Sequence, residues 1–366
     1  MKKIAITGGG TGGHIYPGLA VAAELARRMD GGMGGIFWIG SNSGMDKSIV
    51  EEAGIQFFGI PAGKLRRYFS LRTIPDFFKV IAGFCAARRI LRREKPALLF
   101  SKGGYVSVPP CAAAASLGIP VITHESDFSP GLATKINARF ARIIFTAYAE
   151  TAKWFPQKRR SKIVISGNPV RNDFYTADPQ KGRTFLGIGE SQRVLLVLGG
   201  SQGAQEINGL VRDNVDALCR NYFVVHQAGQ GEDQGAARNA AQGRYKCYAY
   251  IREEMPHVLA CAELVMGRSG AGTVWECAAL GKPMVLVPLS GNSRGDQVEN
   301  ARFFEKAGAA ICLTGADLSG EKLVAAINNL AEDSNRREAM AEASRKAGEA
   351  KGTDKIAAAI MEIANG

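Results

Sequence analysis

The sequence predicts an α/β protein with two doubly wound, parallel-sheet domains that face each other across a cleft. Three observations predict this fold. The chain has 366 residues, which favours two domains at roughly 100–200 residues each. Short β-branched runs alternate with helix-like segments, as in parallel sheets covered by helices. That alternation starts twice with a strand, a glycine-rich turn and a helix, at 3–23 and again at 194–219, so both domains are expected to be Rossmann-like.

Apolar runs bounded by Gly or Pro give the individual strands. In the first half they are 3–7, 36–40, 97–101, 120–124 and 142–147, and a helical pattern covers 19–29. In the second half they are 194–200, 223–229, 263–270 and 283–289. The polar stretch 166–193 is the expected linker, and 334–366 has a helical composition. We therefore expect domains at 1–166 and 167–340, with a C-terminal helix at 341–366 that packs back on the first domain.

Composition excludes several classes of protein. Hydrophobic residues make up 46% and charged residues 22%, which is too apolar for a disordered chain. The seven cysteines are odd in number and form no Cys-x-x-Cys, and there are only four histidines. This argues against a disulfide framework or a zinc site and for a reducing compartment. The N-terminal apolar run stops at glycines, so we expect no secretory signal, and no apolar run is long enough to span a membrane.

Positive charge is concentrated in one segment. The net charge is +12, and residues 1–166 carry +14 of charge against −2 for the remainder. Residues 64–95 contain ten Lys and Arg against Asp76 and Glu94, interleaved with aromatic and aliphatic residues. Such a segment suits an anionic membrane surface, a nucleic acid, or a helix whose apolar face belongs to the core. The phenylalanines favour lipid over a phosphate backbone, so we expect a membrane surface and no nucleic acid.

A glycine-rich turn at residues 8–14, GGGTGGH, follows the first strand and opens a helix. Its bare glycines let backbone amides approach a phosphate, unless the turn serves packing alone. A nicotinamide site needs an acid after the second strand, and none stands at 39–42; the triphosphate-binding motif is absent too. His14 ends the turn and is the candidate general base. Helix capping and space filling are the alternatives for His14.

Polar residues follow two further strands of the first half. Residues 101–105, SKGGY, form a second glycine turn, which could be purely structural. Residues 124–127, HESD, end another strand, and Asp127 either binds sugar hydroxyls or caps a helix at 132–140. No Asp-x-Asp occurs, and Glu125-x-Asp127 is the nearest pattern. We therefore expect no metal, because helix N-termini and Arg171 can neutralise a leaving diphosphate instead.

The second half of the chain also has glycine-rich turns followed by candidate ligand-binding residues. Residues 199–203, GGSQG, form a second phosphate cradle that includes the Ser201 hydroxyl. Glu276 follows a glycine-rich turn at 267–272 and either accepts both ribose hydroxyls or interacts with a helix dipole. Asp296 and Gln297 follow the strand at 283–289 and a polar loop, where a sugar would lie.

Together these motifs identify a resemblance. GGGTGGHIYPGLAVA, SKGGYVSVPP, SGNPVR, GGSQGAQ and RSGAGTVWE occur in this order along the chain. The sequence resembles the MurG family, the undecaprenyl-diphospho-muramoylpentapeptide N-acetylglucosaminyltransferases of GT-B fold. The resemblance implies inverting transfer of GlcNAc from UDP-GlcNAc to the muramoyl 4-hydroxyl of lipid I, giving the peptidoglycan precursor lipid II without a cofactor. It also implies a peripheral location on the cytoplasmic face of the membrane, and makes other cell-wall synthesis and division proteins candidate partners.

The same resemblance assigns roles to single residues. It makes His14 the catalytic residue, as base or orienting group, and lets backbone atoms at Ile251 read uracil. The donor contacts it carries over are Thr11, Gly12, Gly13, Arg171, Ser201, Ile251, Glu276 and Gln297. Ala271, Gly272 and Thr273, in the glycine-rich turn before Glu276, are further candidate substrate-binding residues. Two positions depart from the family. Many members carry Gln-Asn where this chain has Ser126-Asp127, and many carry Gln or His in place of Asp296. An ionised carboxylate accepts but cannot donate a hydrogen bond, so Asp127 and Asp296 are candidate sugar contacts of altered chemistry.

Other functions fit parts of the pattern. A UDP-sugar 2-epimerase of the same fold would need no lipid acceptor and no basic 64–95 surface. A glycosyltransferase acting on diacylglycerol would differ only in its acceptor. A nicotinamide oxidoreductase would need the missing acid, and a non-catalytic nucleotide-binding module would leave His14 and Glu276 without a role.

Overall fold

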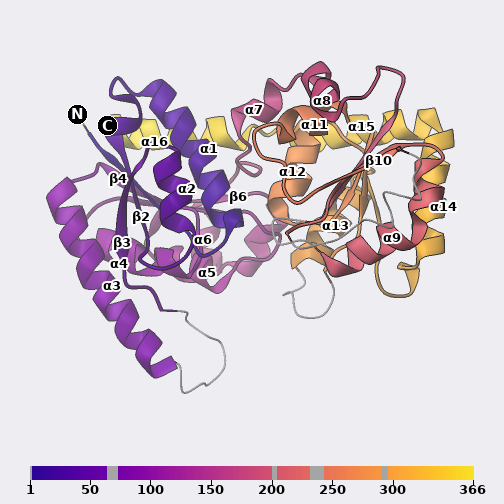
Figure 1. Ribbon diagram of the computed structural model, residues 1–366. Coiled ribbons are helices and arrows are strands. Elements are labelled where there is room, and N and C mark those ends of the chain that lie inside the picture. The colour runs from indigo at the N-terminus through magenta and orange to yellow at the C-terminus, as the bar shows by residue number, and fades with distance from the viewer. Residues whose placement is uncertain (1, 64–72, 200–203, 231–242, 290–295) are drawn as a thin grey trace. The chain divides into compact units, whose positions relative to one another are not determined.

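The computed structural model describes residues 2–63, 73–199, 204–230, 243–289 and 296–366, and it divides into two compact units. The first unit contains Met1–Arg171 and Ala350–Gly366, and the second contains Asn172–Glu349. Each unit is built around one parallel sheet with helices on both faces (Figure 1). The predicted pair of parallel-sheet α/β domains is thus confirmed.

The first sheet has seven strands in the order β3-β2-β1-β4-β5-β6-β7, all parallel. Their bounds are β1 Ile4–Thr7, β2 Ile36–Ser41, β3 Gln56–Ile60, β4 Leu98–Ser101, β5 Val121–Glu125, β6 Ala141–Thr146 and β7 Ile163–Ile165. The strand order reverses between β1 and β4, and doubly wound sheets bind their ligands at the carboxyl ends of strands beside such a reversal.

Alternate residues of the central strand β1 enter two separate hydrophobic clusters, as strand geometry requires. Ile4 and Ile6 contribute to the cluster under α1 and α16, whereas Ala5 contributes to the cluster under α3 and α4. Helices α1 and α16 lie side by side in Figure 1. The helices of this unit are α1 Gly12–Arg28, α2 Asp46–Glu52, α3 Thr73–Glu94, α4 Val108–Ser116, α5 Leu132–Asn137, α6 Gln157–Arg160 and α16 Gly352–Asn365.

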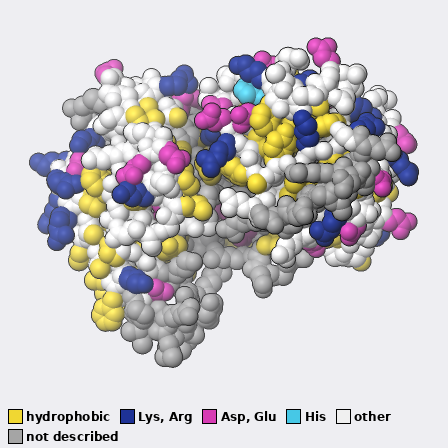
Figure 2. All heavy atoms as spheres, in the orientation of Figure 1, with side chains coloured by type: hydrophobic (Ala, Val, Ile, Leu, Met, Phe, Trp, Pro, Cys, Tyr) yellow, Lys and Arg dark blue, Asp and Glu magenta, His cyan; other side chains and the backbone are white. Residues whose placement is uncertain are grey.

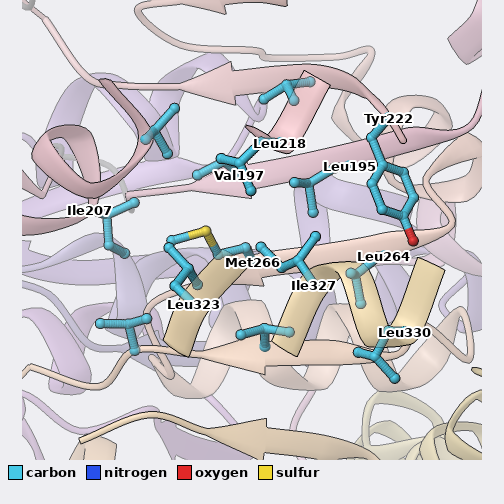
Figure 3. Close-up of a cluster of buried hydrophobic side chains, with 14 of the residues drawn as sticks. Leu195, Val197, Ile207, Leu218, Tyr222, Leu264, Met266, Leu323, Ile327 and Leu330 are labelled. Carbon is cyan, nitrogen blue, oxygen red and sulfur yellow. The ribbon is translucent and has the colours of Figure 1, made fainter. Parts of the chain in front are cut away.

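The second sheet has six parallel strands in the order β10-β9-β8-β11-β12-β13. They are β8 Val194–Leu198, β9 Phe223–Gln227, β10 Tyr245–Tyr248, β11 Leu264–Gly267, β12 Met284–Leu286 and β13 Ala310–Cys312. The helices are α7 Asn172–Tyr175, α8 Pro179–Leu186, α9 Gln205–Cys219, α11 Met255–Cys261, α12 Ala271–Ala279, α13 Asp296–Lys306, α14 Gly320–Glu332 and α15 Ser334–Gly348. Figure 3 shows the core of this unit, where Leu323 and Ile327 of α14 lie against Val197 and Met266 of the strands.

The predicted linker at 166–193 is instead mostly part of the second unit. Helices α7 and α8 occupy this stretch and pack against α11. Phe174 and Leu186 are fully or almost fully buried, and the Cβ that Gly182 lacks would lie 2.2 Å from the carbonyl oxygen of His257. The prediction of a linker was wrong because sparse apolar residues in a polar, proline-containing stretch conceal two short packed helices.

The predicted C-terminal helix is also interrupted. Helix α15 belongs to the second unit, and only α16 packs on the first. Lys351 adopts a left-handed backbone with φ of 41°, and a Cβ at Gly352 would lie 2.8 Å from the carbonyl oxygen of Asn168. The chain therefore breaks where it approaches other backbone too closely for a side chain. None of the helices that the structure describes combines the length and the hydropathy that crossing a bilayer requires.

Candidate functional site

Two glycine turns meet at the carboxyl edge of the first sheet. The first glycine turn, residues 8–13, joins β1 to α1, and the second glycine turn, residues 102–104, follows β4. Gly104 has a φ of 78°, and a Cβ there would lie 2.3 Å from the carbonyl oxygen of Gly9. The turns therefore approach backbone to backbone, which only glycine allows.

His14 lies where these two turns meet. A Cβ on Gly104 would be 3.0 Å from its Cδ2 atom, and a Cβ on Gly103 would be 3.6 Å from its Nδ1 atom. The ring is half-buried, and it belongs to the first turn of α1. The N-cap of α1 is Thr11, so the alternative that His14 caps this helix is wrong. Its position suits a group that acts on a ligand held by the glycine turns.

Asp46, which the sequence analysis missed, braces the first glycine turn. Its carboxylate accepts the backbone N–H of Gly10 at 3.0 Å and that of Ser41 at 3.3 Å, and the residue is 1% exposed. The acid stands five residues beyond the end of β2 and folds back from the start of α2. Because both oxygens are bonded to backbone amides, Asp46 holds the turn in place and is not presented to a ribose.

The segment after β5 is organised by Glu125. Its two carboxylate oxygens accept the N–H groups of Asp127 and Gly131, each at 3.1 Å. Helix α5 begins with Gly131 as its N-cap. The alternative that Asp127 caps this helix is therefore wrong, and the half-buried carboxylate of Asp127 stays a candidate ligand contact.

His124, at the end of β5, is neutral. Its Nε2 donates to the carbonyl oxygen of Gly167 at 3.0 Å, and burial, together with the charge of Lys102, holds the pKa of His124 well below the usual value.

Lys102 is a second residue that the sequence analysis did not single out. Its Nζ donates to Ser126 Oγ at 2.5 Å, and Ser126 Oγ donates to Asn168 Oδ1 at 2.6 Å. Burial lowers the pKa of Lys102 to about 8, against the opposing effect of the Glu125 and Asp127 carboxylates. No short-range motif points to this residue, because its partners lie more than twenty positions away in the sequence.

The second unit brings its candidate residues to the carboxyl edge of its own sheet. Ile251 is 3% exposed and donates its backbone N–H to Oε1 of Gln227, the last residue of β9, at 2.8 Å. Gln227 was not predicted. Ser201 and its glycine-rich turn lie outside the described residues, and α9 begins just after it.

Two helices of the second unit present the remaining candidates. Ala271, Gly272 and Thr273 form the first turn of α12, whose N-cap Gly270 offers no side chain. Glu276 is half-buried in the second turn, beyond the first turn in which a helix dipole is strongest. That position disfavours the helix-dipole alternative.

Gln297 is fixed at the start of the next helix, α13. Its side-chain Oε1 accepts the N–H of Leu289 at 2.9 Å, and its carbonyl oxygen accepts the hydroxyl of Ser269 at 2.6 Å. Asp296 is the first residue of α13. Arg171 is grouped with the first unit, at its boundary with the second. Within the described ranges, no group of three His, Cys, Asp or Glu side chains could hold a metal ion.

Comparisons with known proteins assign the chain to a family. Residues 4–146 match the glycosyltransferase family 28 N-terminal domain, and residues 194–356 match its C-terminal domain. A Treponema denticola protein, the UDP-N-acetylglucosamine–N-acetylmuramyl-(pentapeptide) pyrophosphoryl-undecaprenol N-acetylglucosamine transferase, is 50% identical over 92% of this chain and 90% of its own. The chain belongs to glycosyltransferase family 28. A Shouchella clausii member of the same name is 42% identical over 90% of this chain and 91% of its own.

Solved structures agree with this family 28 assignment. The crystal structure of Acinetobacter baumannii MurG has a TM-score of 0.75 and 25% identity, over 99% of this chain and all of that one. A UDP-GlcNAc 2-epimerase from Neisseria meningitidis has a TM-score of 0.70 over 99% of this chain and all of its own, but at 13% identity it shows the fold alone. The resemblance to MurG and the GT-B fold are confirmed, and this family 28 chain is a glycosyltransferase.

Proposed function

We propose that the chain transfers GlcNAc from UDP-GlcNAc to the muramoyl 4-hydroxyl of undecaprenyl-diphospho-MurNAc-pentapeptide, lipid I, with inversion at the anomeric carbon. The product is lipid II, the precursor of peptidoglycan. The observation that carries this proposal is the 50% identity, over 92% of the chain, to a relative named for that reaction. The site supports it, because each unit places amide-rich helix N-termini and polar side chains at the carboxyl edge of its sheet.

The donor binds mainly to the second unit. The N–H of Ile251 is held by Gln227, which leaves the Ile251 carbonyl oxygen to accept the N3–H of uracil. Glu276 accepts the ribose hydroxyls, and the first-turn amides of α12, from Ala271, Gly272 and Thr273, face the diphosphate with Ser201 and Arg171. Gln297 has its side-chain oxygen engaged, so its amide group donates to the sugar. Asp296 accepts a sugar hydroxyl.

The acceptor binds to the first unit. Its diphosphate lies over the first glycine turn, near the amides of Thr11, Gly12 and Gly13, which we assign to the acceptor although the resemblance lists them among the donor contacts. Asp127 accepts a sugar hydroxyl. The oxygen of the muramoyl 4-hydroxyl attacks the anomeric carbon while His14 takes the proton of this hydroxyl. UDP departs with the electron pair of the bond that joined it to the anomeric carbon. Fixed amide dipoles and Arg171 stabilise the charge on UDP. Neither a metal nor a cofactor enters this scheme.

Helix α3 is the proposed membrane contact. Phe77, Phe78 and Ile81 are 55%, 64% and 46% exposed, whereas Ala87 and Leu91 farther along the helix are fully buried. The alternative that the apolar face of this helix belongs to the core therefore holds only for its C-terminal half. Figure 2 shows hydrophobic side chains over the N-terminal half and Lys and Arg side chains over the C-terminal half. This arrangement suits peripheral binding to the anionic cytoplasmic face of the cell membrane. Residues 64–72 lie outside the described residues.

The reaction is tested with labelled UDP-GlcNAc and a short-chain lipid I analogue. We expect label in the lipid only when the acceptor is present, and His14→Ala should lower kcat about a hundredfold or more with little change in KM for UDP-GlcNAc. Formation of UDP-ManNAc without acceptor would indicate an epimerase, and transfer to diacylglycerol alone would indicate a different acceptor. Either result would overturn the proposed function.

The membrane contact is tested by cosedimentation with vesicles of phosphatidylglycerol and phosphatidylcholine. Replacing Phe77 and Phe78 with Ser should weaken binding about tenfold or more, since each phenylalanine contributes roughly 1.5–3 kcal/mol when buried. The matched control is Ile165→Ser, at a residue 52% exposed on strand β7. Equal binding by all three proteins would contradict this part of the proposal. Other cell-wall synthesis and division proteins stay candidate partners.

A further inference from the structure

A second basic segment lies in the first unit, apart from α3. Residues 131–162 contain eight Lys and Arg against Glu150 alone, a net charge of +7. Together with the ten Lys and Arg of residues 64–95, they account for the whole positive excess of residues 1–166. The proposed reaction uses none of the charges of this second segment, so their clustering needs another explanation.

Trp154 is an exposed aromatic side chain within this segment. It is 42% exposed, whereas the next residue, Phe155, is 3% exposed and packs in a small buried cluster. The Nζ atoms of Lys135 and Lys153 lie 5.3 Å and 5.5 Å from the centroid of the Trp154 ring. We call Trp154, Lys135 and Lys153 the tryptophan surface. An indole beside lysines with long apolar stems suits the boundary between water and lipid.

The tryptophan surface adjoins the acceptor edge of the first sheet. Lys153 Nζ also lies 4.9 Å from the centroid of the Phe128 ring, and the hydroxyl of Thr151 donates to the carbonyl oxygen of Phe128 at 3.0 Å. Phe128 directly follows Asp127, the proposed sugar contact. The surface therefore stands beside the place proposed for the acceptor, whose undecaprenyl chain anchors it in a membrane.

The same surface lies on the face of the sheet that α3 covers. Helix α4 packs against α3 and against α5, which carries Lys135, so these helices form one layer opposite α1 and α16. Gly63, just beyond the end of β3, packs against the backbone of Asp76 in α3, which places the start of α3 at the carboxyl edge. Trp154 follows β6 and lies toward that edge too. One membrane surface can therefore contact both places.

We propose that the tryptophan surface is a second contact with the anionic membrane, which places Trp154 among phospholipid headgroups beside the bound acceptor. The inference rests on the proposed function for the lipid acceptor and for the first contact at α3. Lipid suits the surface because the indole and the lysine stems bury in the headgroup region while the ammonium groups bind phosphates. The high positive charge of residues 131–162 complements such a surface.

The chain contains its own probe for this contact. Of its three tryptophans, Trp38 and Trp275 are 0% and 4% exposed, so a change of solvent exposure reports on Trp154. The test uses vesicles of phosphatidylglycerol and a phosphatidylcholine brominated near the headgroup end of its chains, which quenches an indole in contact with it. We expect quenching in the parent and none in Trp154→Phe. Vesicle binding without quenching would overturn the proposal and leave the α3 contact standing, whereas no vesicle binding would overturn both contacts.

The role of the two lysines is tested with a double variant, Lys135→Gln with Lys153→Gln. We expect it to bind the same vesicles about tenfold or more weakly, and to turn over the short-chain lipid I analogue at the parent rate. The matched control is Lys181→Gln with Lys346→Gln, at exposed lysines of the second unit, which should bind within about twofold of the parent.

The remaining outcomes separate this surface from its alternatives. An equal loss of vesicle binding in both double variants would show an effect of net charge alone and refute the tryptophan surface. A shift of Trp154 fluorescence with a DNA duplex but not with vesicles would assign the surface to nucleic acid and refute it as well. If the parent transfers no sugar but vesicles quench Trp154, the membrane contact stands and the proposed reaction fails.

Discussion

The carboxylate of Asp46 accepts the backbone N–H of Gly10 at 3.0 Å, across 36 positions of sequence. It also fills the space beside Gly9, where a Cβ would lie 2.0 Å from its Oδ2 atom. The first glycine turn is therefore held by an acid from the start of helix α2, and its shape does not depend on its own glycines alone. Because one amide of the turn is engaged in this way, the acceptor diphosphate must rely on the amides that follow it.

Asp46→Ala should loosen the first glycine turn. Two backbone amides would lose their acceptor, and the one at Ser41 is buried, where an unsatisfied group costs about 1–3 kcal/mol of stability. We expect kcat/KM for the lipid acceptor to fall about tenfold or more, and Asp46→Asn, which keeps one acceptor oxygen, to lose less. Glu52→Ala, at an exposed acid that ends the same helix, is the control. Identical stability and activity of the Asp46→Ala and Glu52→Ala proteins would contradict the bracing role.

Gly104→Ala should displace His14 from its place between the turns. The new methyl group would lie 2.3 Å from the carbonyl oxygen of Gly9 and 3.0 Å from His14 Cδ2, in a backbone that already has a φ of 78°. We expect kcat to fall about tenfold or more while KM for UDP-GlcNAc stays nearly constant. Gly118→Ala is the matched control, because Gly118 has a φ of 70° but open space around it. Equal kcat values for the two variants would mean that backbone strain, not contact with His14, explains any loss.

Gln227→Ala should weaken binding of UDP-GlcNAc and leave binding of the acceptor unchanged. The variant frees the N–H of Ile251, so the backbone proposed to bind uracil loses its anchor. We expect KM for UDP-GlcNAc to rise about tenfold, with KM for the acceptor unchanged. Gln227→Glu keeps an acceptor oxygen and should lie closer to the parent protein. A rise in acceptor KM of the same size would show that Gln227 supports the fold of the whole enzyme and not the uracil site.

The sequence predicted the central strands because their residues form short, β-branched, fully buried runs. Strands β3, β7, β10 and β13 were not predicted. All four are the edge strands of their sheets, and β7 and β13 are only three residues long. Edge strands are half-exposed, so polar residues such as Gln56 and Lys246 interrupt their apolar pattern. Hydrophobic periodicity detects a strand through its burial, and it fails where burial is partial.

The candidate site divides in a similar way. His14 could be predicted because it adjoins a recognisable turn in the sequence. Asp46 and Lys102 could not, because each acts on a partner that only the fold brings close. Along α3, apolar residues recur with the same spacing in both halves, so sequence alone could not separate the exposed Phe78 from the buried Leu91. Contacts over long sequence separation, and the presence or absence of a covering element, are set by topology.

His226 should make the stability of the second unit depend on pH. The ring is fully buried, and its two nitrogens are bonded to Tyr245 Oη at 2.8 Å and Asn208 Oδ1 at 3.1 Å. Burial lowers its pKa to about 4, whereas an unfolded histidine titrates near about 6.5. The unfolded chain therefore binds this proton first, so stability is full above about pH 6.5 and is lost as the pH falls toward 4.

Between about pH 8 and about pH 5, this one group should cost about 2 kcal/mol of unfolding free energy. The measurement is urea unfolding at both pH values, for the parent and for His226→Gln, whose amide does not titrate. Other histidines, including the buried His124, contribute equally to both proteins and cancel in the difference. Should the variant fail to fold, NMR titration of the His226 ring in the parent gives the same answer. A ring that protonates above about pH 6 would refute the prediction, because it would show that burial does not lower the pKa of His226.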